Sequence, residues 1–257
     1  MTRWIWLPIT VLVLAGCSTS APKVPMPDSA PAAGTEVAVS SQDGGGAERS
    51  VVRLSAIAPS CSTQIDGTGF VYARERVVTA AHVVAGAVPV SLVVTTADGE
   101  EYEGRVVAFD PDVDVAVLYV PKLPAPALRI TSAPEPLLSL PWLSLGEADM
   151  VGFPKGAKRL ERRPVEIERQ FKAEGPNIYR EGQVTREVLG FSAEADAGLS
   201  GAPLILEEGT VAGMVFASGK EDPGQGFALA GEEVLRVADR AAEATKHVST
   251  QKCDEDG

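Results

Sequence analysis

The stretch DAGLSGAPLI, Asp196 to Ile205, places a serine between two glycines and continues into an apolar segment typical of a β-strand. Gly198 and Gly201 permit backbone conformations that other residues adopt at a cost, so the chain can turn sharply and direct successive N–H groups at one point. Such N–H groups beside a serine hydroxyl can stabilise an oxyanion as it forms. The stretch therefore predicts a nucleophile at Ser200, with an ordinary surface turn as the alternative.

A nucleophilic serine needs a base, and the chain contains two histidines. His82 follows an apolar strand-like segment in GTGFVYARERVVTAAHVVAG, residues 67–86, whereas His247 lies in a polar tail typical of the surface. Imidazole is the usual general base near neutral pH. His82 is the candidate base, with a structural histidine as the alternative, and the rate is expected to fall as His82 takes up a proton at acid pH.

The segment FDPDVDVAVLYV, residues 109–120, supplies a candidate carboxylate. Asp114 precedes a fully apolar run, where a buried carboxylate needs a hydrogen-bonding partner such as an imidazole N–H. Asp110 and Asp112 fit exposed turn positions better. A calcium loop would need a glycine at its sixth position and a glutamate at its twelfth, which this segment lacks, so we expect no metal site.

The three candidates follow one another in the order His82, Asp114, Ser200. This is the triad order of chymotrypsin-like proteases. An α/β-hydrolase would place the serine first and a helix directly after it, whereas APLILEEG, residues 202–209, is typical of extended chain. The order therefore favours a protease-like triad.

Short β-branched segments alternate with turn residues through most of the chain, at a spacing typical of sandwiches and barrels. They form two β-rich halves, at about 50–122 and from about 143, joined by a Pro-rich connection at about 123–142. Residues 230–247 carry apolar side chains at helical spacing, with Glu232 and Glu233 in the first turn. We therefore predict an all-β fold with a C-terminal α-helix ending near residue 247.

The N-terminus predicts export from the cytoplasm. One positive charge at Arg3 precedes an apolar run that is short for a membrane span, and Leu14 to Cys17 resembles a bacterial lipobox. We therefore predict a lipoprotein signal peptide over 1–16 and lipidation at Cys17, with an uncleaved anchor as the alternative. Residues 17–48 are rich in Pro, Ala, Ser and Gly and predict a flexible tether.

Composition narrows the function. The formal net charge of −12 repels phosphate backbones, so nucleic acid is not an expected partner. Lipidation at Cys17 would leave Cys61 and Cys253 in an oxidising compartment, either paired or as two separate thiols.

Four segments carry a family resemblance: GTGFV, TAAHVVAG, DPDVDVAVLYVPKLPAPAL and GLSGAPLI resemble trypsin-like and HtrA-like bacterial proteases. A narrower likeness runs from Val51 to Cys253 and includes GPNIYREGQVTREV, residues 175–188. Over this range the chain is similar to the periplasmic acid-resistance serine proteases of mycobacteria. The resemblance covers nearly all of the predicted protease domain, residues 49–257.

The resemblance implies a chymotrypsin-like double β-barrel with six strands in each barrel and the active site between them. It implies an extracytoplasmic endopeptidase that needs no cofactor or metal. Separately, we expect a monomer that acts on extended polypeptides of the cell envelope. His82 would be the base, Asp114 would orient it and Ser200 would attack, with the N–H groups of Gly198 and Ser200 as the oxyanion hole. The family's terminal disulfide would correspond to Cys61 and Cys253.

Two departures from the family qualify this expectation. The similar mycobacterial proteins carry several transmembrane helices, whereas here the lipobox would anchor the chain to the outer face of the cytoplasmic membrane. The family reads Gly, Asp or Asn, Ser, Gly, Gly, Pro around the nucleophile, and this chain has Leu199 and Ala202 instead. Leu199 could shield the site, line a pocket or hold the loop in an inactive shape. A catalytically silent binding or scaffolding lipoprotein is therefore the alternative function, and a structural lipoprotein with an accidental triad is a third.

Substrate contacts are expected at two places. Glu194, six residues before the nucleophile, would favour a basic residue before the scissile bond if it lines the primary pocket. The segment VFASG, residues 215–219, would offer a strand edge on which a substrate pairs, with contacts at Ala217, Ser218 and Gly219.

Overall fold

The computed structural model describes residues 46–59, 62–133, 144–219, 222 and 224–253. The predicted signal peptide, Cys17 and Cys61 lie outside these ranges, as does nearly all of the predicted tether. Within them, no helix combines the length and the hydropathy that crossing a bilayer requires.

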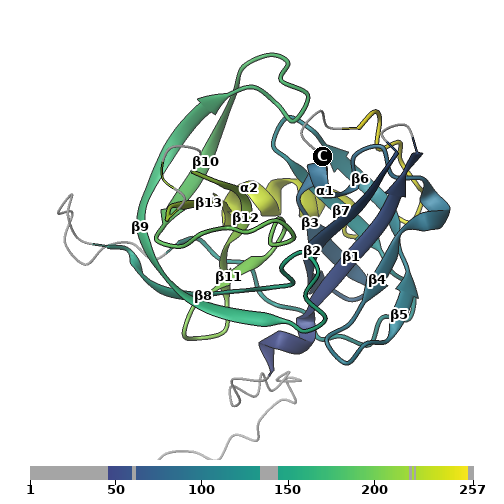
Figure 1. Ribbon diagram of the computed structural model, residues 1–257, viewed down its shortest axis with the longest axis horizontal. Helices are drawn as coiled ribbons and strands as arrows, with labels where there is room; N and C mark the ends of the chain where they lie inside the picture. Colours follow the sequence, from purple (N-terminus) through teal and green to yellow (C-terminus); the bar gives the residue numbers. More distant parts are fainter. Residues whose placement is uncertain (1–45, 60–61, 134–143, 220–221, 223, 254–257) are drawn as a thin grey trace, which may run out of the picture. The chain divides into compact units, whose positions relative to one another are not determined.

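The first half of the described chain is a curled antiparallel sheet (Figure 1). It consists of seven described strands in the order β5-β4-β1-β2-β3-β7-β6. Their bounds are β1 Val51–Ala58, β2 Thr63–Ala73, β3 Arg76–Thr79, β4 Val93–Thr95, β5 Glu101–Glu103, β6 Arg105–Asp110 and β7 Val115–Tyr119. β3 and β7 run through the middle of the core, where their Val, Leu and Ala side chains are fully buried.

The expected count of six strands in this half is wrong because Gly104 divides one segment into β5 and β6. The Gly104 N–H donates to the Leu92 carbonyl at 3.1 Å. A Cβ at this position would lie 3.0 Å from Cγ2 of Val94, so glycine allows a close backbone approach where the strand bends.

The second half is a closed barrel of six described strands in the order β10-β13-β12-β11-β8-β9. Their bounds are β8 Gly146–Gly152, β9 Glu161–Gly175, β10 Val184–Phe191, β11 Pro203–Ile205, β12 Val211–Ser218 and β13 Gly226–Ala230. The connection between the halves bonds to both, because Leu128 donates to Val71 and Thr131 donates to Val211. The predicted all-β class is confirmed.

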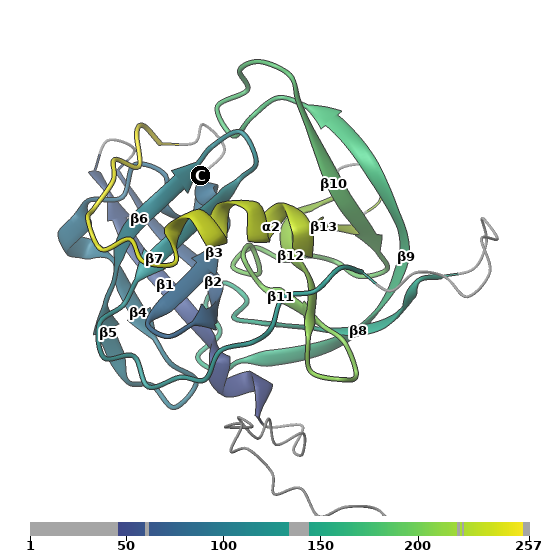
Figure 2. The same cartoon turned by 180° about the vertical axis from the view of Figure 1, so that it is seen from behind.

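Helices are short and lie at junctions. The structure has α1 at Ala81–Val84 and α2 at Gly231–Ala238, with 3-10 turns η1 at Ala47–Ser50, η3 at Pro89–Ser91 and η4 at Asp239–Ala241. α2 packs against β6 and β7 of one half and β12 and β13 of the other, and Figure 2 shows it lying across the back of both.

The C-terminal helix is shorter than its sequence pattern predicts. The hydroxyl of Tyr72 donates to the carbonyl of Ala238 at 2.9 Å, and the chain beyond η4 turns back along the first half. There Val248 donates to Val106 at 2.9 Å and Gly86 donates to Thr250 at 3.1 Å. Hydrogen bonds to the first half therefore replace the last predicted helical turns.

Candidate active site

His82 lies in the short helix α1, directly after strand β3. Its neighbours Ala80, Ala81, Val83 and Val84 are all buried. Packing of these apolar residues forces the chain out of the strand and leaves the imidazole, 22% exposed, as the polar group of the turn. His247, in contrast, is exposed in the C-terminal tail.

Asp114 is buried and binds His82 through both carboxylate oxygens. Its Oδ2 lies 2.8 Å from Nδ1 of His82, and its Oδ1 accepts the backbone N–H of His82 at 2.9 Å. Asp114 is only 4% exposed. Because an ionised carboxylate can only accept, this contact places the imidazole proton on Nδ1 and leaves Nε2 as the basic nitrogen.

The turn that carries Asp114 is held by its own aspartates. Asp114 has a φ of 69°, a left-handed conformation that costs a residue other than glycine about 1 kcal/mol or more. The Oδ1 of Asp110 accepts the N–H groups of Asp112 and Val113, each at 3.1 Å, and its carbonyl accepts the Asp114 N–H at 3.0 Å. Asp110 is thus a turn residue that fixes the backbone leading into Asp114.

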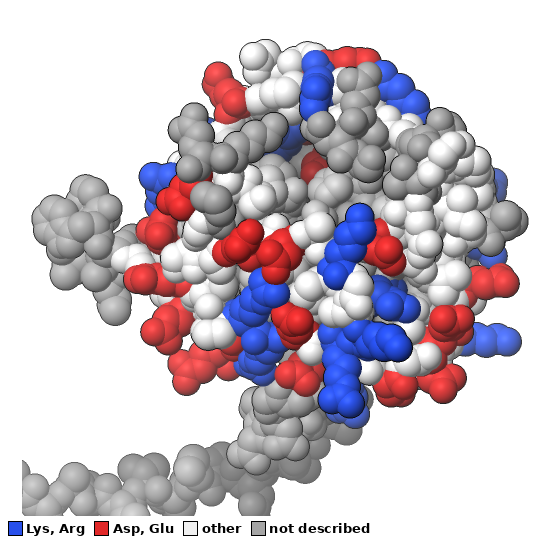
Figure 3. All heavy atoms as spheres, viewed as in Figure 1, with Lys and Arg blue, Asp and Glu red and all other residues white. Residues whose placement is uncertain are grey.

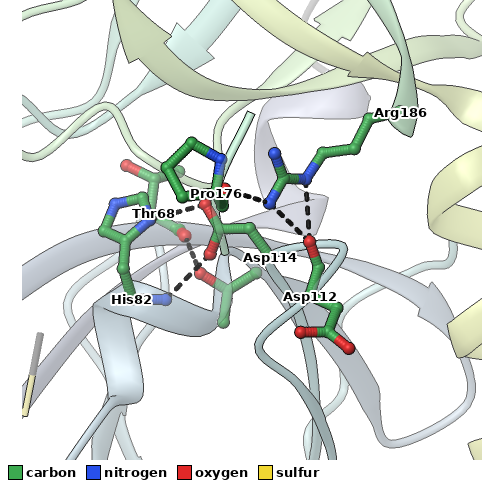
Figure 4. A network of polar contacts seen from close by, with 7 residues as sticks. Thr68, His82, Asp112, Asp114, Pro176 and Arg186 are labelled. Atoms are coloured by element: carbon green, nitrogen blue, oxygen red, sulfur yellow. Dashed lines mark hydrogen bonds and ion pairs between the residues drawn. The ribbon is translucent and has the colours of Figure 1, made fainter. Parts of the chain in front are cut away.

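Arg186 of β10 reaches across from the second half to hold the same turn. Its Nε donates to the Asp112 carbonyl at 2.8 Å, Nη2 donates to that carbonyl as well, and Nη2 also donates to the Pro176 carbonyl at 3.0 Å (Figure 4). Arg186 is only 8% exposed. Sequence reasoning missed this residue, although it lies inside the quoted stretch 175–188.

Three backbone N–H groups of the loop that carries Ser200 are paired within the second half. Leu199 N–H donates to the Asp196 carbonyl, Gly201 N–H donates to Val215, and Ala202 N–H donates back to the Leu199 carbonyl, at 3.0, 2.7 and 2.9 Å. Gly201 has a φ of 87°, and a Cβ there would collide with the Thr68 carbonyl. The glycine is therefore required for this turn.

The two N–H groups predicted to form the oxyanion hole differ from these three. Among the hydrogen bonds of the described residues, neither Gly198 N–H nor Ser200 N–H donates to a protein acceptor. Gly198 has a φ of 92°, and a Cβ there would lie 2.5 Å from the backbone nitrogen of Lys155. This arrangement leaves two donors for a developing oxyanion beside the serine hydroxyl.

Leu199 points away from the cleft. It is 1% exposed and packs in the core of the second half with Ala202 and Met150. Leu199 also lies close to Gly152, because a Cβ added to Gly152 would lie 2.9 Å from Cδ2 of Leu199. Neither shielding of the site nor lining of a pocket fits this position. The leucine anchors the nucleophile loop in the core.

One cleft of about 510 Å³ brings the candidate residues together. Its walls include His82, Gly198 and Ser200, together with Gln64 to Asp66 of β2 and Val215 to Ser218 of β12. It therefore joins residues from both halves at the place where the resemblance implies an active site.

The predicted substrate contacts divide into two groups. Ala217 and Ser218 line the cleft, on a part of β12 that pairs only with β13 among the described strands. Glu194 is exposed and lies outside the cleft lining, as does Gly219. The position expected for Glu194 is taken by small residues and by Asp196, whose carboxylate binds Arg163 Nη1 at 2.7 Å.

The structure therefore gives no support to a preference for basic residues set by Glu194, because Glu194 lies outside the cleft lining and Asp196, which lies in it, already binds Arg163. On the face shown in Figure 3, acidic and basic side chains are interspersed. Cys253 lines the cleft and Cys61 lies outside the described residues, so their pairing stays a prediction, as does lipidation of Cys17.

The fold and the cleft define a class of protein: the chain belongs to the trypsin-like peptidases. A model of the trypsin-like peptidase domain matches residues 67–214, which span all three candidate triad residues. The predicted family is thereby confirmed.

The relatives include a mycobacterial enzyme. Serine protease Rv3671c of Mycobacterium tuberculosis is 38% identical over 209 residues, which are 80% of this chain and 49% of the relative. The chain thus spans about half the length of that curated relative. The crystal structure of the active form of the Rv3671c protease superposes with a TM-score of 0.74 at 36% identity, covering 81% of this chain and 87% of the other. An inactive form of the same protease gives 0.63 at 35% identity, covering 76% and 89%.

Proposed function

We propose that this chain is a serine endopeptidase that hydrolyses peptide bonds in extended polypeptides by a triad of His82, Asp114 and Ser200. One observation carries the proposal: the buried Asp114 carboxylate binds the backbone N–H and the ring Nδ1 of His82, and His82 and Ser200 line the same cleft. The higher TM-score against the active form of the Rv3671c protease than against its inactive form supports it.

The chemistry follows from these positions. The Ser200 hydroxyl attacks the scissile carbonyl carbon while Nε2 of His82 takes its proton, and Asp114 stabilises the imidazolium that forms. The carbonyl oxygen becomes an oxyanion that accepts the N–H groups of Gly198 and Ser200. Collapse of this intermediate breaks the C–N bond as His82 protonates the leaving amine, and a water molecule activated by His82 then hydrolyses the acyl-enzyme.

An extended substrate suits the cleft better than a folded one. The edge of β12 at Ala217 and Ser218 has a β-strand partner on one side only among the described residues, so a substrate strand can pair on the other side. The neighbouring cleft residues Ala195, Ala197 and Val215 are small or apolar. We therefore infer an uncharged side chain before the scissile bond.

Location and anchoring complete the proposal. The lipobox at Leu14 to Cys17 supports an exported, lipid-anchored protein. The resemblance to periplasmic acid-resistance serine proteases supports a role in envelope protein processing or in the response to stress and acid. The alternative of a silent scaffold was motivated by Leu199. Because that side chain is buried in the core, it neither shields nor lines the cleft, and this favours turnover over a silent scaffold.

The test is cleavage of an unfolded polypeptide, such as reduced and carboxymethylated casein, by the purified chain. Wild type should cleave it, and Ser200→Ala should not. Ser192→Ala is the matched control, because Ser192 is exposed and outside the cleft lining, and it should cleave like wild type. Absence of cleavage by folded wild type would overturn the proposal.

A further inference from the structure

Thr68 of β2 is a fully buried polar residue at the contact between the two halves. Its exposure is 0%, at a strand position where a valine would satisfy the packing equally well. A buried hydroxyl is costly unless it is hydrogen-bonded. Its partners therefore indicate why a hydroxyl is needed.

Those partners belong to the nucleophile loop. The Thr68 hydroxyl donates to the Gly198 carbonyl at 2.7 Å, and the Thr68 backbone N–H donates to the Ser200 carbonyl at 3.0 Å. One residue of the first half thus binds the carbonyls of both residues that we propose as oxyanion donors, and both of these residues line the cleft. These contacts join positions about 130 residues apart in the sequence.

The hydroxyl oxygen and the backbone carbonyl of Thr68 also accept hydrogen bonds. Its hydroxyl oxygen accepts the Phe153 N–H at 2.9 Å, and its carbonyl accepts the Thr79 hydroxyl at 2.6 Å. The hydroxyl proton is directed at the Gly198 carbonyl, because a carbonyl oxygen can only accept, and the hydroxyl oxygen uses a lone pair to accept from Phe153. Linked donors of this kind strengthen one another in a buried site.

The contacts fix each oxyanion residue on both sides. In a trans peptide the N–H points opposite to the preceding carbonyl. The Ala197 carbonyl accepts Lys155 N–H at 2.6 Å and the Leu199 carbonyl accepts Ala202 N–H at 2.9 Å. The Gly198 N–H therefore points away from Lys155, and the Ser200 N–H points away from Ala202. Thr68 then holds the following carbonyls, so neither Gly198 nor Ser200 can rotate without breaking a buried hydrogen bond.

From this geometry we infer that Thr68 is a positioning residue for catalysis. Its hydroxyl holds the peptide groups of the oxyanion hole in place and does not touch substrate. The inference rests on the proposed function, because it assigns Gly198 and Ser200 as the donors. It adds that the first half contributes to the oxyanion hole as well as supplying His82 and Asp114.

The test compares Thr68→Val, which keeps the shape and removes the hydroxyl, with Thr68→Ser, which keeps the hydroxyl. Thr95→Val is the control, because Thr95 is buried in β4 with a hydroxyl that has no hydrogen-bond partner among the described residues. Thr68→Val should lower kcat by roughly 10- to 100-fold with KM little changed, approaching the loss seen when one oxyanion donor is removed. A peptide aldehyde, whose adduct carries the oxyanion, should bind more weakly by the same factor.

Thr68→Ser and Thr95→Val should stay within a few-fold of wild type in kcat and in aldehyde binding. If Thr68→Val matches wild type in both, the positioning role is overturned. If kcat and KM change without a loss of aldehyde affinity, Thr68 acts on substrate binding and the inference is also wrong.

Hydrogen exchange separates this result from a failure of the proposed function. In Thr68→Val the amides of Leu199, Gly201 and Ala202 should exchange faster than in wild type, and in Thr68→Ser they should not. If wild type is inactive, the function fails while the exchange data still test the contact. Unchanged amide exchange in a folded Thr68→Val protein would contradict the positioning role of Thr68 whether or not wild type is active.

Discussion

Replacing Leu199 by asparagine restores a residue type that the family carries before its nucleophile, yet we expect it to damage this protein. Leu199 is 1% exposed among core residues, and full burial of a leucine contributes about 1.5–3 kcal/mol. An amide buried there without a partner costs a further 1–3 kcal/mol or so. The expected loss of unfolding free energy is therefore about 3–5 kcal/mol.

For a domain of this size, each kcal/mol lowers Tm by about 2–4 °C, so Leu199→Asn should melt about 6–20 °C below wild type. Leu199→Met conserves volume and should cost less than about 1.5 kcal/mol. Thermal unfolding followed by circular dichroism measures both variants, and kcat/KM at a temperature where all are folded measures activity. An unchanged Tm with a large gain in kcat/KM for Leu199→Asn would refute this reasoning and show that the natural loop is held inactive.

Three further predictions follow from the contacts around the triad and the helix. Asp114→Asn loses the acceptor that places the proton on Nδ1 of His82 and should lower kcat by about 10³- to 10⁴-fold. His247→Ala changes a residue of the exposed tail and should leave kcat and KM unchanged. Steady-state assays of both variants measure these effects. Arg186→Met removes the hydrogen bonds to the Asp112 and Pro176 carbonyls and should loosen the Asp114 turn, which lowers kcat/KM and shifts the acid limb of its pH profile, with partial recovery in Arg186→Lys; a profile that keeps its shape would exclude this coupling. Burial raises the pKa of Tyr72 to about 12, above the usual phenol value of about 10, so the stability that the neutral phenol contributes is complete below about pH 10 and is lost as the pH rises toward 12. Urea unfolding of wild type should show this loss, and Tyr72→Phe should not.

The candidate triad could be read from the sequence because each member lies in a local pattern. His82 follows an apolar strand and two alanines, Asp114 precedes an apolar strand, and Ser200 lies between two glycines. Their chain order then indicates the trypsin-like family. Strand periodicity likewise predicted the β-rich halves, since it depends on neighbours a few residues away.

Other features could not be predicted, because they depend on partners distant in the sequence. Thr68 and Arg186 bind backbone carbonyls more than 70 residues away, and a carbonyl carries no sequence information. The sequence does not show whether Leu199 faces the cleft or the core, and the structure places its side chain in the core. Spacing alone suggested that Glu194 lines a pocket, but the local loop leaves it exposed and brings Asp196 to the wall instead.

The role of Ser200 as an activated nucleophile is tested most directly by a fluorophosphonate probe on the purified chain, followed by peptide mapping of the adduct. We predict one adduct per chain, on the peptide that contains Ser200, lost in Ser200→Ala and in His82→Ala and kept in His247→Ala. A folded wild-type protein that forms no adduct, or an adduct that maps to another serine, would contradict the proposed triad.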